Sequence, residues 1–245
     1  MNRTIMELTA RQLLGRRRTL FLGLVALLPV AIALAYRLSG SSDDYLNFTV
    51  NGLVDGLIVT VLLPLAALVI GTSVLGAEIE DGTAVYLLSK PIPRWQIIAS
   101  KLAAASAVTA ALVGLSTAVS TLVALGGEPG QGIVPAFTVA VALGSVVYCA
   151  AFIFLSILTS RAFVVGLAYV FIWEGLVVGL FSGTRILSIH EYTLGVGGGL
   201  SHVSTRIFDP GLGGLQAVAL MVVIGALTFW LAVRRLSGWE MGESG

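Results

Sequence analysis

Two carboxylates lie inside long apolar runs, where an ionisable side chain is costly enough to mark a functional candidate. Glu174 lies well inside the run at 162–181, beside Trp173, and Asp55 lies near one end of the run at 53–76. Each could line a substrate path or bind a cation. Glu174 could instead be protonated or hydrogen-bonded between helices, and Asp55 could reach the membrane interface.

The other residues that carry chemistry match no defined site. His190, Glu191 and His202 could be metal ligands, but their spacing fits no known metal motif, so no metal is expected. Cys149 is the sole cysteine, which excludes an intramolecular disulfide. A G-x-x-x-x-G-K-[ST] phosphate loop and even a Gly-Lys dipeptide are absent. With Glu174 almost alone among polar groups in the membrane, we do not expect an enzyme.

The elements that hold these carboxylates are expected to be membrane helices. Hydrophobic residues make up 57% and charged residues 11% of the 245 residues, against about half and about a quarter in soluble domains. The apolar runs are about 20 residues long, which suits helices crossing a core of ~30 Å. The sequence therefore predicts an all-α integral membrane fold, with one transmembrane domain over 1–245. Six spans are expected, at about 19–36, 53–76, 102–125, 133–159, 162–181 and 215–233.

The N-terminal region predicts a helix lying along the membrane surface over 3–15, because its charged and apolar residues fall on different faces. Those faces are formed by Arg3, Glu7 and Arg11 and by Met6, Ala10 and Leu13. Pro29 is expected to kink the first span. A signal peptide is the alternative, because Ala33-Leu34-Ala35 resembles a cleavage site.

The distribution of basic residues predicts the orientation, because positively charged flanks stay in the cytoplasm. A cytoplasmic N-terminus leaves only Arg37, Arg185 and Arg206 outside and eleven Lys and Arg residues inside. We therefore expect a multi-pass protein of the plasma (inner) membrane with both termini cytoplasmic. The net charge of +1 gives no basis for binding nucleic acid.

One cytoplasmic loop, at 77–101, differs from the other connections. Acidic residues crowd its start, a short apolar stretch follows, and Pro91 and Pro93 stop any helix before Arg94 and Lys101. This pattern predicts a compact amphipathic element near the membrane surface, with apolar residues available to a partner.

In this loop the sequence resembles the permeases of the type 2 class of ATP-binding-cassette transporters. In that family the pattern after the second span reads roughly E-x-x-x-G-T-x-x-x-L-L-x-x-P-x-x-R. The residues that fill it here are Glu78, Gly82, Thr83, Leu87, Leu88, Pro91 and Arg94. The six spans, the surface helix and the long outer segment at 182–214 are also similar to the family.

The resemblance implies a half-transporter, in which two such subunits, identical or closely related, each rest on an ATPase subunit. Two ATPase copies would then supply ATP and Mg, with no cofactor in this chain. The loop would couple the ATPases to the membrane helices through Glu78, Glu80, Asp81, Gly82, Thr83, Leu87, Leu88, Pro91 and Arg94. The segment at 182–214 is expected to be partly re-entrant, and Gly175, Gly179 and Gly183 form a packing stripe that could face the second subunit.

The predicted function is export of a hydrophobic or amphiphilic compound, by alternating access at a dimer interface. The direction comes from the family resemblance, and the substrate class from the aliphatic path, with membrane lipid as a further partner. A secondary transporter or channel that needs no ATPase is the alternative, although the two halves contain no convincing internal repeat.

Overall fold

The described part of the chain is entirely helical apart from turns and connections. The computed structural model describes residues 9, 17–40, 44–80, 93–128, 130–180 and 182–238. The elements are α2 (Arg17–Val25), α3 (Leu28–Leu38), α4 (Tyr45–Asn47), η1 (Phe48–Leu62), α5 (Leu63–Glu80), α7 (Arg94–Leu125), α8 (Ile133–Leu158), α9 (Ala162–Ala168), η2 (Tyr169–Val177), α10 (Val178–Leu180), η3 (Ser182–Leu187), α11 (Ile189–Leu200) and α12 (Gly214–Ser237). The predicted surface helix at 3–15 lies outside these residues, apart from Thr9.

Within the described ranges, 5 helices are long and apolar enough to cross a membrane. They are Phe21–Leu38, Tyr45–Gly76, Arg94–Leu125, Ile133–Leu158 and Gly214–Ser237. Five of the six predicted spans correspond to these helices, so the all-helical membrane class is confirmed. The third span begins earlier than predicted, because its helix continues through the polar residues that follow Pro93.

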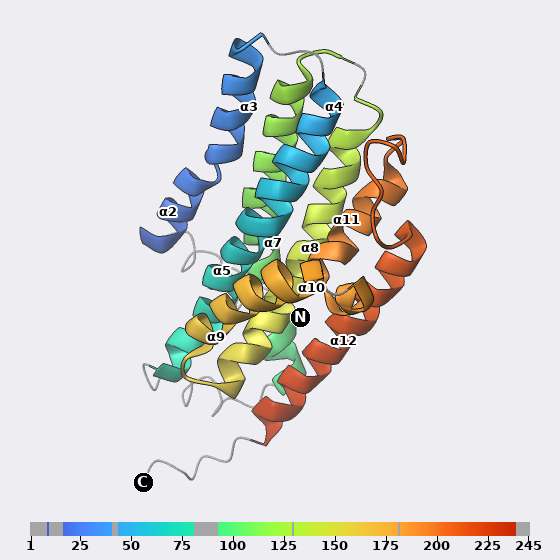
Figure 1. Ribbon diagram of the computed structural model, residues 1–245. Helices are drawn as coiled ribbons and strands as arrows, with labels where there is room; N and C mark the ends of the chain where they lie inside the picture. Colours follow the sequence, from blue (N-terminus) through green and yellow to red (C-terminus); the bar gives the residue numbers. More distant parts are fainter. Residues whose placement is uncertain are drawn as a thin grey trace.

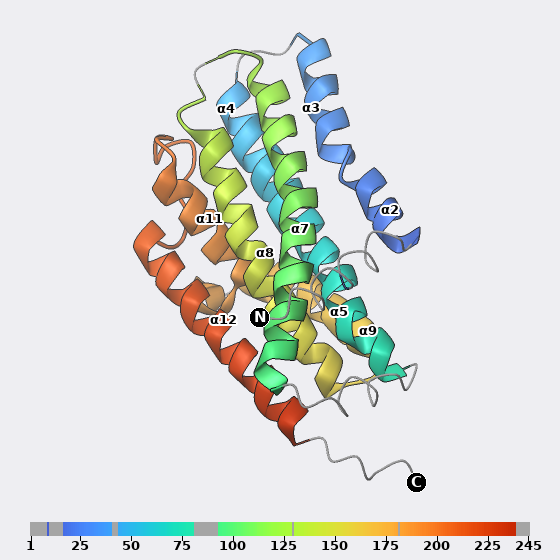
Figure 2. The ribbon, with the colours of Figure 1, turned by 180° about the vertical axis from the view of Figure 1, so that it is seen from behind.

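Helix α8 is the centre of the bundle, since it packs against α5, α7, α11 and α12. Figures 1 and 2 show α2 and α3 along one side of the bundle and α12 along the opposite side. We call the end where α5, α8 and α12 finish and α7 and α9 begin the loop end. The opposite end carries the turn between α7 and α8, where the Arg37 guanidinium donates to the Gly126 carbonyl at 2.8 Å.

The first span breaks before Pro29, as the sequence predicts. Helix α2 ends at Val25, and Pro29 lies in the first turn of α3. Proline has no N–H and cannot continue the hydrogen-bond ladder, which leaves carbonyls unpaired at the break. The Ser116 hydroxyl of α7 donates to the Ala26 carbonyl at 2.5 Å. A neighbouring helix thus satisfies one carbonyl within the break between α2 and α3.

The fifth apolar run is divided into short elements. Its apolar helix, Ala162–Val177, is shorter than a span of about 20 residues. Figure 1 shows α9 and α10 crossing the loop half of the bundle, and α11 continuing from mid-depth toward the opposite end. The predicted crossing at 162–181 and the re-entrant character of 182–214 are not established by length and composition, so both stay predictions.

Glycines allow α11 to approach the start of α12 closely. A Cβ added to Gly199 would lie 2.7 Å from the Gly214 Cα, and one added to Gly195 would lie 2.9 Å from the Leu212 carbonyl oxygen. Both distances are shorter than real Cβ contacts allow, and both neighbours are backbone atoms that cannot rotate away. The glycine-rich end of α11 is therefore a helix-packing surface.

We expect Gly199→Ala to lower the melting temperature of the detergent-solubilised protein. The added methyl group must push α11 away from Gly214, and overpacking of this kind costs about 1–3 kcal/mol, or several degrees for a chain of this size. Gly225→Ala is the matched control, because its Cβ would meet only Val147 at an ordinary 3.8 Å. The melting temperatures are measured by size-exclusion chromatography after heating. Equal values for the two variants would contradict the close approach of α11 to Gly214.

Candidate functional site

The two predicted carboxylates lie on two π-helical segments. Asp55 belongs to η1 and Glu174 to η2, which are the π-helical segments of the described chain. The wider i→i+5 turn is rare and frequently marks functional sites. Sequence periodicity did not predict either segment, since a π-helical run carries the same apolar residues as an α-helical one.

The Glu174 carboxylate receives three hydrogen bonds from separate parts of the chain. The Tyr148 hydroxyl donates to one carboxylate oxygen, and the Tyr169 hydroxyl donates to the other at 3.0 Å. That second oxygen also accepts the Ile189 backbone N–H at 3.1 Å. Hydrogen bonds from several donors stabilise a carboxylate that is removed from water. Of the alternatives that the sequence left open for Glu174, the structure shows a hydrogen-bonded carboxyl group.

Glu174 caps α11 from another element. Ile189 is the first residue of α11, so its N–H has no acceptor within the helix. A carboxylate at a helix N-terminus is also attracted by the helix dipole. The Ser188 hydroxyl completes the cap by accepting the Glu191 N–H at 3.3 Å. Together these contacts fix the start of α11 against η2 and α8.

Asp55 pairs with His190, a histidine that the sequence analysis considered as a metal ligand and for which it expected no metal. His190 Nε2 lies 2.9 Å from Asp55 Oδ1 and 3.1 Å from Thr60 Oγ1. The Thr60 hydroxyl donates its hydrogen to the Asp55 carbonyl at 2.8 Å, so its oxygen is left to accept from the ring. This network assigns a proton to Nε2, and the ring is then charged when Nδ1 also carries a proton.

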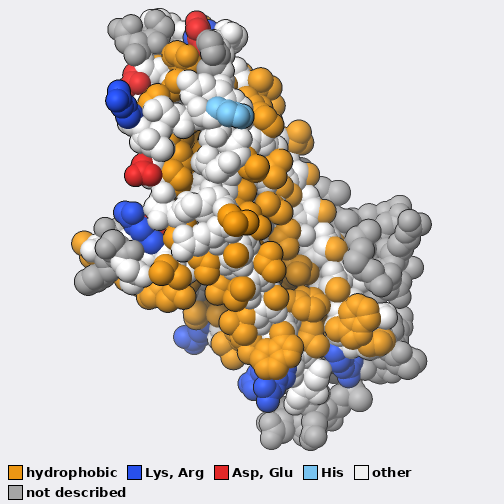
Figure 3. Space-filling view, turned by 90° about the vertical axis from the view of Figure 1, so that its right-hand side faces the viewer, with side chains coloured by type: hydrophobic (Ala, Val, Ile, Leu, Met, Phe, Trp, Pro, Cys, Tyr) orange, Lys and Arg blue, Asp and Glu red, His pale blue; other side chains and the backbone are white. Residues whose placement is uncertain are grey.

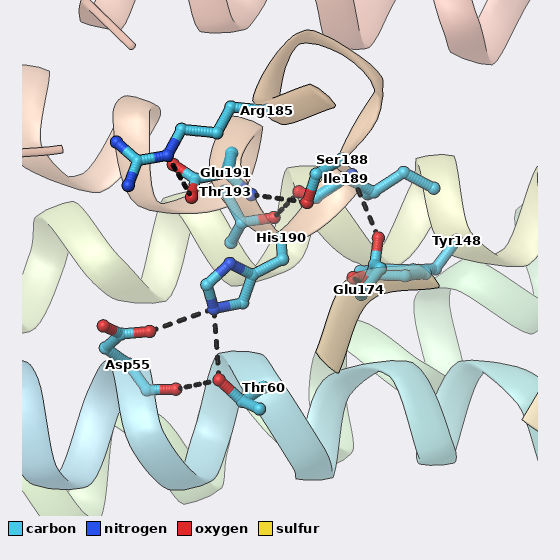
Figure 4. Close-up of polar contacts among 10 residues, drawn as sticks. All are labelled: Asp55, Thr60, Tyr148, Glu174, Arg185, Ser188, Ile189, His190, Glu191 and Thr193. Carbon is cyan, nitrogen blue, oxygen red and sulfur yellow. Dashed lines mark hydrogen bonds and ion pairs between the residues drawn. The ribbon is translucent and has the colours of Figure 1, made fainter. Parts of the chain in front are cut away.

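The two carboxylates do not touch, but they hold consecutive residues of α11. Glu174 binds Ile189 and Asp55 binds His190, from opposite sides of the helix start (Figure 4). We call Asp55, Thr60, Glu174 and His190 the polar cluster. Asp55 and His190 are 135 positions apart, and no spacing rule links residues at such separation. The sequence signal that could have pointed to His190 as a partner was the polarity of the stretch around it.

The charge environment raises the pKa of His190. Burial lowers the pKa of His190, but the hydrogen bond to Asp55 and the negative charges of Asp55, Glu174 and Glu191 outweigh it, so the pKa lies above its usual value. Glu191 is itself paired with Arg185 at 3.7 Å. His202 lies elsewhere, against the turn between α7 and α8, where its backbone N–H donates to the Gln131 carbonyl at 2.8 Å. Among the described residues, no three His, Cys, Asp or Glu side chains gather as metal ligands.

The predicted loop at 77–101 is described only at its two ends. Glu78 and Glu80 belong to the last turn of α5, and Arg94 is the first residue of α7. Asp81, Gly82, Thr83, Leu87, Leu88 and Pro91 lie outside the described residues. The assignment of these residues to coupling therefore stays a prediction.

Lys101 joins the two helices that flank this loop. Its side chain is only 1% exposed, and its ammonium group donates to the Val74 carbonyl of α5 at 2.8 Å. A buried ammonium group is costly unless it is well hydrogen-bonded, so this contact is specific. It connects the helix that enters the loop with the helix that leaves it.

The predicted glycine stripe has open surroundings in the single chain. A Cβ at Gly175 would meet only the Val170 carbonyl of its own segment, at 3.7 Å, and one at Gly183 would meet nothing within 4 Å. No side-chain environment is described for Gly179. Gly175 and Gly183 are therefore open to a further element, and the predicted packing role of the stripe, toward a second subunit or otherwise, remains a prediction.

We expect Asp55→Asn to destabilise the protein more at acidic than at alkaline pH. The raised pKa of His190 means that its ion pair contributes stability below the usual histidine pKa of about 6.5, and that this stability is lost as pH rises through the folded-state pKa. The difference in melting temperature between wild type and variant should shrink from about pH 6 to about pH 9. His202→Gln, at an exposed histidine, should show no such trend. A difference for Asp55→Asn that is constant with pH would contradict a charged pair.

Comparison with known proteins places these features in a family. A family model described as "ABC-2 family transporter protein" matches residues 4–191, well over half of the 245 residues. The match includes the loop at 77–101 and the polar cluster. A search of curated proteins finds no match. The chain belongs to the ABC-2 family of transporter proteins, as a membrane-spanning permease subunit of an ABC transporter.

Proposed function

We propose that this chain is half of an ATP-driven exporter of hydrophobic or amphiphilic compounds. Family membership implies association with an ABC ATPase and typically with another permease. It is also consistent with a subunit that is not itself catalytic. In the proposed assembly two permease subunits, identical or closely related, rest on two ATPase copies that bind ATP and Mg. Family membership disfavours a transporter or channel that needs no ATPase.

The observation that supports coupling is the bond between Lys101 and the Val74 carbonyl. When ATP binding closes the ATPase pair, a loop held in an ATPase groove is displaced. A displacement is transmitted best when the helices on both sides of the loop move as one rigid body. Lys101 joins α5 and α7 close to the loop, and α5 and α7 also pack against each other. Closure would thus reach the central helix α8, which contacts both.

Exposed apolar side chains mark the surface proposed to meet the second permease. The first span exposes Phe21, Leu24 and Leu28, and the fifth apolar run exposes Phe171, Ile172 and Leu176. Helices α2 and α9, which belong to the first span and to the fifth apolar run, both contact α5. An apolar interface of this kind can separate during alternating access without leaving charges unpaired.

The loop itself provides the test of the proposed function. Leu87→Asp, and charge reversal at Glu78, should abolish transport in proteoliposomes containing the co-purified ATPase, while the ATPase still hydrolyses ATP. We expect this result because Leu87→Asp removes an apolar contact with the ATPase and charge reversal at Glu78 removes an acidic one. Full transport together with substrate-stimulated ATPase activity in both variants would contradict the assignment of the loop, and failure of any ATPase to co-purify would contradict the proposed function.

Lys101→Met should reduce transport per ATP hydrolysed by roughly tenfold or more, because losing a charged hydrogen bond costs about 1.5–3 kcal/mol and every 1.4 kcal/mol is about tenfold. Lys101→Arg, which keeps the charge, should retain more of the coupling. Thr117→Val is the matched control on α7, since the buried Thr117 hydroxyl donates only to the Val113 carbonyl of its own helix, at 2.8 Å. Equal coupling ratios for Lys101→Met and Thr117→Val would exclude a role for the Lys101 contact.

A further inference from the structure

A groove lies at the loop end between the last turns of α8 and α12. It encloses about 380 Å³ and is open along one side. Its lining residues are Phe154, Leu158, Leu231, Arg234, Arg235 and Gly238. The wall from α8 is entirely apolar, and the positive charge comes from α12 alone. None of its lining residues belongs to the polar cluster, and Lys101 is not among them.

The two arginines of the groove carry positive charge that no described carboxylate neutralises. Both are exposed, and neither takes part in an ion pair with the residues that the structure describes. The Arg234 guanidinium lies 5.2 Å from the centre of the Trp230 ring, in a cation–π contact that orients it. Arginine binds phosphate with two parallel hydrogen bonds, so a pair of guanidinium groups favours a phosphate-bearing ligand.

The position of the groove at the edge of the apolar surface indicates a lipid. Figure 3 shows hydrophobic side chains covering the lower part of the face that α12 presents, with Lys and Arg side chains gathered at its lower edge. Trp230 is half exposed there, as expected of a residue at the membrane interface. A soluble anion would leave Phe154, Leu158 and Leu231 unused, whereas a phospholipid places a chain against them and its phosphate beside the arginines.

We propose that this groove binds one anionic phospholipid, with its headgroup on Arg234 and Arg235 and an acyl chain along Leu158 and Leu231. Basic pockets between membrane helices bind anionic headgroups in this way. In the predicted orientation the lipid belongs to the cytoplasmic leaflet. It would bridge the loop ends of α8 and α12, whose helices already pack together. The proposal does not depend on the identity of the transported compound or on the direction of transport.

The test is lipid binding by the complete chain purified with its ATPase partner. Native mass spectrometry should show one phosphatidylglycerol retained by wild type, with a Kd roughly tenfold or more below that for phosphatidylcholine. Arg234→Gln combined with Arg235→Gln should remove this preference. Arg161→Gln is the control, because Arg161 is also exposed at the loop end but lies outside the groove.

A second variant distinguishes lipid binding in the groove from attraction to the two arginine charges alone. Leu158→Trp fills the groove while keeping both arginines, and the side chain is 50% exposed, so folding should tolerate it. It should weaken phosphatidylglycerol binding as well. Equal binding of the two lipids, an unchanged preference in the double variant, or full binding by Leu158→Trp would overturn the proposal. Displacement of the lipid from wild type by millimolar inorganic phosphate would show a site for free anions and would overturn the proposal. Loss of the co-purified ATPase from the double arginine variant, with no change in lipid binding, would show that the arginines contact protein and would also overturn it.

Discussion

Helix α11 begins at the buried residue Ile189, whose backbone N–H has no acceptor within the helix, and Glu174 accepts it. An unsatisfied buried amide costs several kcal/mol, so a helix that starts inside a bundle is stable only when other elements provide acceptors. The bond from Ile189 to Glu174 provides one, and Tyr148 and Tyr169 hold the carboxylate in place. The position of α11, and with it the contact with α12 and the pairing of His190, depends on this cap.

The same physical rule appears at two other points in the bundle. Ser116 satisfies one carbonyl within the break between α2 and α3, and Lys101 binds a carbonyl near the end of α5. In each case a side chain of α7 supplies the donor. Helix α7 is therefore more than a spacer between the loop and the opposite end, because it binds both the interrupted first span and the helix that leads into the loop.

The sequence predicted the features that depend on local residues. Five spans followed from apolar length, and the break at Pro29 followed from the missing N–H. The loop pattern led to the family that the family model then matched. Glu174 and Asp55 were identified because carboxylates are costly in lipid, but their partners were not. Tyr148 is 26 positions from Glu174, and His190 is 135 from Asp55, so only the folded chain brings them together. The close contact of Gly199 was missed for the same reason.

The order of synthesis gives the Glu174 cap a consequence for insertion into the membrane. The segment Ala162–Val177 is short for a span and carries an acid, and an acidic residue near the centre of a helix opposes insertion by about 2.5–3.5 kcal/mol. Tyr148 precedes Glu174 in the chain, so this donor is synthesised first, and Ile189 is synthesised last. The Tyr148 hydrogen bond to Glu174 can therefore form as soon as both residues are synthesised, whereas the third bond must wait for the first residue of α11.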